Sequence, residues 1–147
     1  MDKKDFYART MHTPDDPARA RQRAALRETS KSLLPLHQAL INAAKEDYFA
    51  ITSMTATPAQ LVGLLLSDPF FAWLKPVTSL IVDIDEMTRV DFQPSDVDQI
   101  IDRVERLFGA SAESAFAEKY VPLLQRDVDV AIAHAALRQA IRNLREP

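Results

Sequence analysis

Apolar residues recur along most of the chain at spacings of three and four, which is the period of an amphipathic helix. The first such stretch follows an aspartate pair and Pro17, a combination typical of a helix start. Its apolar positions continue as far as Ile51. Pro35 falls inside this stretch, and proline removes a backbone hydrogen bond from a helix. We therefore expect a long first helix that is kinked or broken near residues 31–34.

Prolines divide the next apolar region into short segments. Thr57 and Pro58, with a glutamine three residues after the threonine, match a capping box and a proline at the first helical position. Residues 61–66 are almost entirely apolar, so we expect this short helix to be covered on most sides. A second cap and proline occur at Pro69, and Pro76 either starts a third segment or kinks the second.

The second half of the chain repeats the helical pattern. A helix is predicted to begin near Pro94 and to end at Gly109, since glycine is favoured just after a helix. A shorter helix follows, interrupted or bent at Pro122. The last helix, over 130–144, is rich in alanine, and such a face allows another helix to approach closely.

These patterns predict an all-α fold. The simplest arrangement is a four-helix up-down bundle with a proline-broken second arm and short extra helical segments, because short connections favour antiparallel neighbours. Residues 14–147 are predicted to form a single helical-bundle domain, which suits a chain of 147 residues. Residues 1–13 are polar and aperiodic and are predicted to be a loose arm.

Composition narrows the class of protein further. The chain has only 2 glycines, which argues against hairpins and tight strand connections. It has no cysteine, so disulfides and thiolate chemistry are excluded. The most apolar stretch is broken by charges and prolines before it reaches the roughly 20 residues of a membrane span, and the first residues carry no apolar leader. We therefore expect a cytoplasmic protein with no membrane span.

Charge is unevenly distributed although the net charge is only −3. A basic stripe with four-residue spacing on the first helix is a candidate interaction surface, formed by Arg19, Arg23, Arg27 and Lys31. Residues 83–105 hold eight acidic side chains against only Arg89 and Arg103, and they could pair with this stripe in the same or a second chain. Nucleic-acid binding is disfavoured because the pI is about 5.6 and no aromatic residues interleave the arginines. Self-association or a protein partner fits the charge pattern better, and a simply solvated face is the alternative.

Catalytic motifs are absent from the sequence. There is no nucleophile elbow, no phosphate-binding glycine loop and no metal-ligand spacing, so no cofactor and no metal are predicted. Two histidines and nearby carboxylates could meet across a bundle, and four aromatic residues, Tyr48, Phe70, Phe71 and Trp73, could line an apolar pocket. The candidate ligand-binding residues are His37, Tyr48, Phe70, Trp73, Asp83, Glu86 and His134. The same residues more commonly serve as hydrogen-bonded histidines, solvated carboxylates and core aromatics.

Two blocks of sequence resemble a family of small, uncharacterised bacterial all-helical proteins. The first reads DPFFAWLKP at 68–76 and LIVDIDE at 80–86, and the second reads LQRDVDV at 124–130 and AHAAL at 133–137. A proline often stands in that family where this chain has Val128. The resemblance implies a helical bundle and brings no activity with it.

The sequence alone does not reveal the function. The leading hypothesis is a non-catalytic helical interaction or scaffold domain, possibly a homodimer. A small-molecule or metal-binding bundle is the alternative, and it predicts an internal cavity with converging polar groups. An enzyme of unknown class ranks third.

Overall fold

A computed structural model describes residues 14–146, in which all regular structure is helical and no strand occurs. The all-α prediction is confirmed. The predicted loose arm, residues 1–13, lies outside the described residues. The elements in chain order are α2 (Pro17–Thr52), α3 (Pro58–Ser67), the 3₁₀ helix η1 (Pro69–Leu74), α4 (Lys75–Met87), α5 (Pro94–Phe108), α6 (Ala115–Arg126) and α7 (Val128–Arg145).

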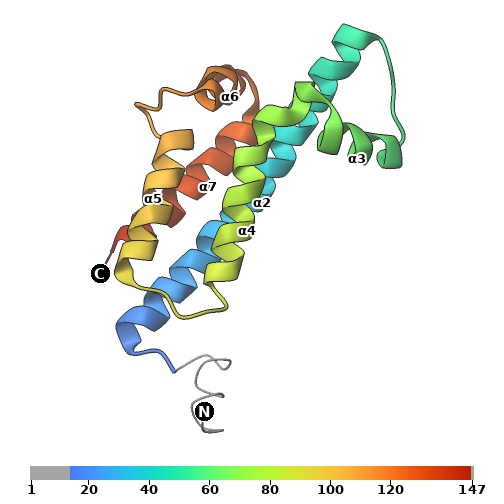
Figure 1. The fold of residues 1–147 in the computed structure, drawn as a ribbon. Coiled ribbons are helices and arrows are strands. Elements are labelled where there is room, and N and C mark those ends of the chain that lie inside the picture. The colour runs from blue at the N-terminus through green and yellow to red at the C-terminus, as the bar shows by residue number, and fades with distance from the viewer. Residues whose placement is uncertain (1–13, 147) are drawn as a thin grey trace, which may run out of the picture.

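Four helices, α2, α4, α5 and α7, lie side by side, and the chain direction alternates from one to the next (Figure 1). This arrangement is compatible with the predicted up-down bundle. The start of α2 and the end of α7 lie at one end of the bundle (Figure 1). At the other end, α6 covers one side, and α3 projects sideways beside the last turns of α2 (Figure 1).

The core fills the space between these four helices. Its fully buried side chains come from all of them and include Leu33, Leu80, Val104, Leu137 and Ile141. The most extensive contact joins α2 to α7. Both helices bury alanines, namely Ala39, Ala43 and Ala44 on α2 and Ala133 and Ala140 on α7. Small side chains of this kind let two backbones approach closely, as the alanine pattern of the last helix predicted.

Prolines affect the helices in two different ways. The second arm is divided as predicted, because Thr57 forms a capping box with Gln60 and the Asp68 carboxylate accepts a hydrogen bond from the Phe70 amide at 2.9 Å. By contrast α2 is continuous over 36 residues through Pro35, so of the kink or break predicted near residues 31–34 the break does not occur. Fully buried side chains on both sides of this proline hold the helix in the bundle, which compensates for the lost hydrogen bond. Likewise α6 continues through Pro122.

Within residues 14–146 no single helix is both long and apolar enough to cross a bilayer. Pro58–Ser67 and Pro69–Met87 together meet the length and hydropathy of a span, but they are bent by 76° at their junction.

Candidate interaction surface

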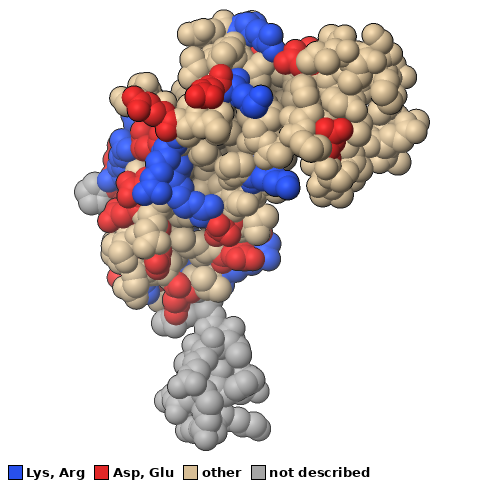
Figure 2. Space-filling model, turned by 45° about the horizontal axis from the view of Figure 1, so that its top comes forward, with Lys and Arg blue, Asp and Glu red and all other residues tan. Residues whose placement is uncertain are grey.

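The end of α2 and the whole of α3 form a part of the molecule that carries no charge. Residues 48–67 contain no Asp, Glu, Lys or Arg, a run of twenty positions in a chain that is 27% charged. We call these residues the uncharged lobe. In Figure 2 the projecting part on the right is mostly tan, whereas blue and red side chains gather over the bundle.

Large apolar side chains of the uncharged lobe face solvent. Ile51 is 73% exposed, Met54 57%, Val62 55% and Leu66 74%, and α3 has no buried residue. The prediction that residues 61–66 are covered on most sides is therefore wrong. The reason is geometric: the main contact of α3 is with η1, and α3 projects beyond the bundle, so no helix lies across its outer face. Apolar surface concentrated in this way is typical of an interaction site.

An apolar cleft of about 230 Å³ lies where α3 approaches α2 and the start of α4. Six of its nine lining side chains are apolar, namely Ile41, Val62, Leu65, Leu66, Phe71 and Leu74. The other three are His37, Lys75 and Thr78, so polar groups come only from the bundle helices. The uncharged lobe thus offers both protruding apolar side chains and a concave apolar surface.

His37 is the predicted ligand-binding residue that the structure places in this cleft. Its Nε2 lies 3.2 Å from the Thr78 hydroxyl oxygen. Burial lowers the pKa of the imidazole below its usual value of 6.5, so the ring is neutral at pH 7. A neutral imidazole hydrogen-bonded to a hydroxyl can hold a ligand atom in place, but it has no partner here for proton transfer chemistry.

The predicted aromatic residues divide into two groups. Tyr48 and Phe70 lie 5.3 Å apart between ring centroids, and both contact Phe71. Trp73 instead packs against Phe116 of α6, with 5.5 Å between centroids. Phe70 and Trp73 also line a smaller cleft of about 190 Å³ on the α6 side. All three predicted residues are half-buried, and their main role is to attach η1 to its neighbours.

The other predicted ligand-binding residues are not brought together with His37. Asp83 is exposed and pairs with Arg103 at 2.7 Å, and Glu86 is exposed on the same helix. His134 accepts or donates a 2.6 Å hydrogen bond through Nδ1 with the Tyr120 hydroxyl. Among the described residues no three His, Cys, Asp or Glu side chains are grouped so as to hold a metal ion. The mixed site of histidines and carboxylates therefore does not form.

The His134–Tyr120 pair joins a half-buried histidine to a buried tyrosine. Tyr120 is 1% exposed, and burial raises the pKa of its hydroxyl well above the usual value of 10.0. Burial, followed by the nearby Arg138 guanidinium, lowers the pKa of His134 below 6.5. A neutral tyrosine facing a neutral histidine is a satisfied core hydrogen bond.

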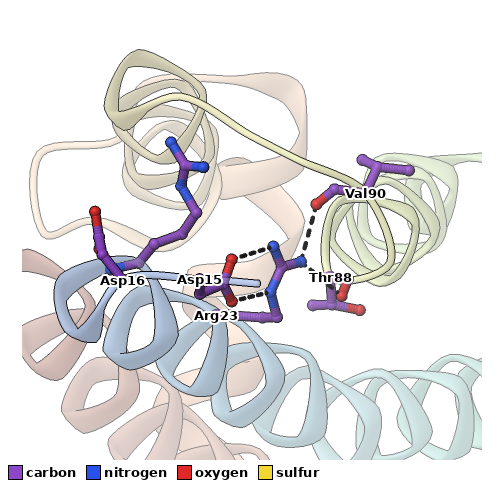
Figure 3. A network of polar contacts seen from close by, with 6 residues as sticks. Asp15, Asp16, Arg23, Thr88 and Val90 are labelled. Carbon is purple, nitrogen blue, oxygen red and sulfur yellow. Dashed lines mark hydrogen bonds and ion pairs between the residues drawn. The ribbon is translucent and has the colours of Figure 1, made fainter. Parts of the chain in front are cut away.

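Arg23, in the middle of the predicted basic stripe, faces inward and is 4% exposed. Its guanidinium binds both carboxylate oxygens of Asp15, at 2.8 and 3.1 Å, and donates to the backbone oxygens of Thr88 and Val90 at 2.9 Å (Figure 3). The guanidinium carbon also lies 4.9 Å from the centre of the Phe92 ring. The stripe is therefore not a continuous surface, because its central charge is used inside the fold.

The remaining basic residues do not form a concentrated patch. Arg19 is half-buried, whereas Arg27 and Lys31 are exposed. Lys31 pairs with Glu28 of the same helix at 3.3 Å. Such a solvated pair adds little stability and leaves little net positive charge for a partner.

Sequence reasoning missed the residues that make the uncharged lobe a surface. Helical periodicity assigned Ile51 to the apolar face of the first helix, and residues 61–66, including Val62 and Leu66, were expected to be covered, while Met54 attracted no prediction. The signal that could have found them is the absence of charge across residues 48–67, since a buried helix in a bundle of this size usually has one solvated face.

Comparison of the chain with protein-family models, with curated proteins and with solved structures finds no match. The functional conclusion therefore depends on the geometry of the molecule.

Proposed function

We propose that the protein is a non-catalytic helical interaction domain that binds a second copy of itself through the uncharged lobe. The observation that supports this proposal is the exposed apolar surface at the end of α2 and on α3, where four large side chains are each more than half exposed. Burying apolar surface stabilises a complex by about 25 cal/mol per Å². A surface of this kind favours association over an isolated state.

The distribution of charge favours a second copy as the occupant. Each molecule carries a net charge of −3, and its charged side chains lie on the bundle. Two copies that meet through residues 48–67 bring no like charges into contact. A twofold contact through a face that carries charged residues would place like charges opposite one another unless they were paired.

The shape of the lobe also favours a symmetric pair. A twofold interface uses the same surface on both subunits, so it needs protrusions and a hollow on one face. Ile51 and Met54 protrude, and the cleft beneath α3 is an apolar hollow on the same lobe. In a twofold dimer the protruding side chains of each copy can pack against the apolar surface of the other.

Sedimentation equilibrium of paired variants tests the proposal. The double variant Ile51→Glu with Met54→Glu places two charges on the lobe without altering the residues that line the cleft. The matched control is Val128→Glu with Ile132→Glu on α7, where the two side chains are 72% and 66% exposed. We expect a dimer for the unaltered protein and for the control, and a monomer with unchanged helical circular dichroism for the lobe variant.

Three results would contradict the proposal. A monomeric unaltered protein at about 100 μM would exclude a dimer of useful affinity. Dissociation by the α7 control instead of the lobe variant would move the interface to α7. Binding of a monomeric protein to neutral phosphatidylcholine vesicles, lost in the lobe variant, would assign the lobe to a lipid surface.

A further inference from the structure

We propose that the cleft beneath α3 binds a small monocarboxylate with an apolar tail, the carboxylate lying at Lys75 and Thr78 and the tail between α2 and α3. The proposed self-association would cover the same cleft, but Ile51 and Met54, on which that self-association depends, do not line it. Changing Ile51 and Met54 therefore tests the dimer without changing the proposed ligand site, and the two proposals can fail independently.

The size of the cleft sets the size of the ligand. Its volume of about 230 Å³ is below the range of about 300–1,000 Å³ that holds drug-sized ligands. It exceeds the volume of about 150 Å³ that is enough for benzene in an apolar cavity. A ligand with a tail of roughly six to eight carbon atoms fits between these limits.

The polar residues of the cleft determine the ligand's charge. None of the nine lining residues is acidic, and one is a lysine. Lys75 is exposed, and among the described residues no carboxylate pairs with its ammonium group, so the group is available to a ligand. A carboxylate matches its charge and, beside a hydrogen-bond donor, forms a charge-assisted contact.

Thr78 supplies the second contact because of its pairing with His37. The imidazole is neutral and lies 3.2 Å from the Thr78 oxygen through Nε2. In the tautomer with its proton on Nε2, His37 donates to that oxygen and leaves the threonine hydroxyl proton for a ligand oxygen. The histidine therefore orients the hydroxyl toward a ligand and does not itself carry charge.

The apolar tail would complete the packing of α3. This helix has no buried residue, and Val62, Leu65 and Leu66 all line the cleft. A tail inserted there contacts α3 on one side and Ile41 and Phe71 on the other. Ligand binding should then slow the hydrogen exchange of the α3 amides more than that of the amides in any bundle helix.

Titration with octanoate tests this site, with octan-1-ol as the neutral probe of the same length. Binding is followed by calorimetry and by methyl resonances of Ile, Leu and Val. We expect octanoate to bind at least tenfold more tightly than octanol, with shifts concentrated at Ile41, Val62, Leu65, Leu66 and Leu74. Lys75→Gln should remove this preference and Thr78→Val should reduce it, whereas the exposed control Lys31→Gln should leave it unchanged. Lys75 and Thr78 are exposed, so both variants should fold.

Equal affinity for octanoate and octanol would overturn the proposal, as would unchanged octanoate binding in Lys75→Gln. Shifts spread over the whole core would also overturn it, because they indicate non-specific partition. The same titration in the Ile51→Glu, Met54→Glu variant separates the two proposals. Tight octanoate binding there supports the cleft whatever the oligomeric state, and loss of binding there shows that the cleft exists only in an assembled pair and contradicts an independent site.

Discussion

Arg23 holds the start of α2 against the turn that follows α4, although its side chain is charged and almost completely buried. Removing a charge from water is costly, and the cost is offset here by a two-oxygen contact with Asp15, by two backbone oxygens and by the Phe92 ring. Those backbone oxygens have no other helical partner, since they belong to the turn between α4 and α5. One side chain therefore satisfies three separate groups.

Replacing Arg23 with methionine should destabilise the protein by about 3 kcal/mol, because the backbone oxygens of Thr88 and Val90 lose a donor in a buried setting and the contact between Arg23 and Asp15 is lost. Urea unfolding followed by circular dichroism measures this change. The control Arg27→Met, on an exposed position of the same helix, should change the free energy of unfolding by less than about 0.5 kcal/mol. Similar losses in both variants would show that the network contributes little.

For single residues, the sequence correctly placed Arg23 on a helical stripe, but it did not predict that the side chain is buried. The spacing of four residues shows that Arg19, Arg23 and Arg27 share one side of α2, and it holds in the structure. Spacing does not show that Asp15 and the backbone at Thr88 lie close to Arg23, because Thr88 is 65 positions away. His37 was selected because it lies on an apolar stripe. Its hydrogen-bond partner Thr78 could not be predicted from local spacing, because the two residues are 41 positions apart.

Helix boundaries followed the prolines wherever a capping residue preceded them. Predicted starts near Pro17, Pro58, Pro69 and Pro94 are all confirmed. At Pro35 and Pro122 no cap precedes the proline, and the helix continues because its neighbours on both sides are buried. A capping residue followed by proline therefore predicted these four helix starts, whereas burial against neighbouring helices explains why α2 and α6 continue through their prolines.

The two glycines, Gly63 inside α3 and Gly109 at the end of α5, test how tightly these helices are packed. A Cβ added at Gly109 would lie 2.5 Å from the Glu105 carbonyl oxygen, whereas one added at Gly63 would meet nothing within 4 Å. Gly109→Ala should therefore destabilise the protein by about 1–2 kcal/mol, since the end of α5 must shift. Gly63→Ala should cause no loss, because alanine is favoured over glycine inside a helix. Thermal unfolding of both variants checks the difference, and an equal effect would show that the end of α5 adapts freely.

Across the whole molecule the bundle and the uncharged lobe differ in how they are stabilised. The bundle has a continuous core from four helices, whereas α3 is held mainly by its contact with η1 and by its capping residues. The sequence could predict the core, because burial follows helical periodicity. It could not predict that one apolar helix lies outside that core, since periodicity does not show where a helix is placed.

Hydrogen exchange should reveal this difference directly. Amides of α3 should exchange at least tenfold faster than those in the middle of α2 and α7, because few buried contacts oppose local opening of α3. Mass spectrometry of peptides after deuterium labelling measures the ratio, with the protein held at a concentration where the proposed dimer would be dissociated. Protection of α3 equal to that of α7 would show that the lobe unfolds only together with the bundle.

The unbroken α2 also sets a length. A helix of 36 residues is about 54 Å long, and it extends from the end of the bundle where α7 ends to the uncharged lobe. In the proposed dimer, two copies joined at their lobes would place the starts of their α2 helices at opposite ends, separated by up to about 100 Å. Such a dimer would be a rigid spacer whose span is determined by the continuity of one helix through Pro35.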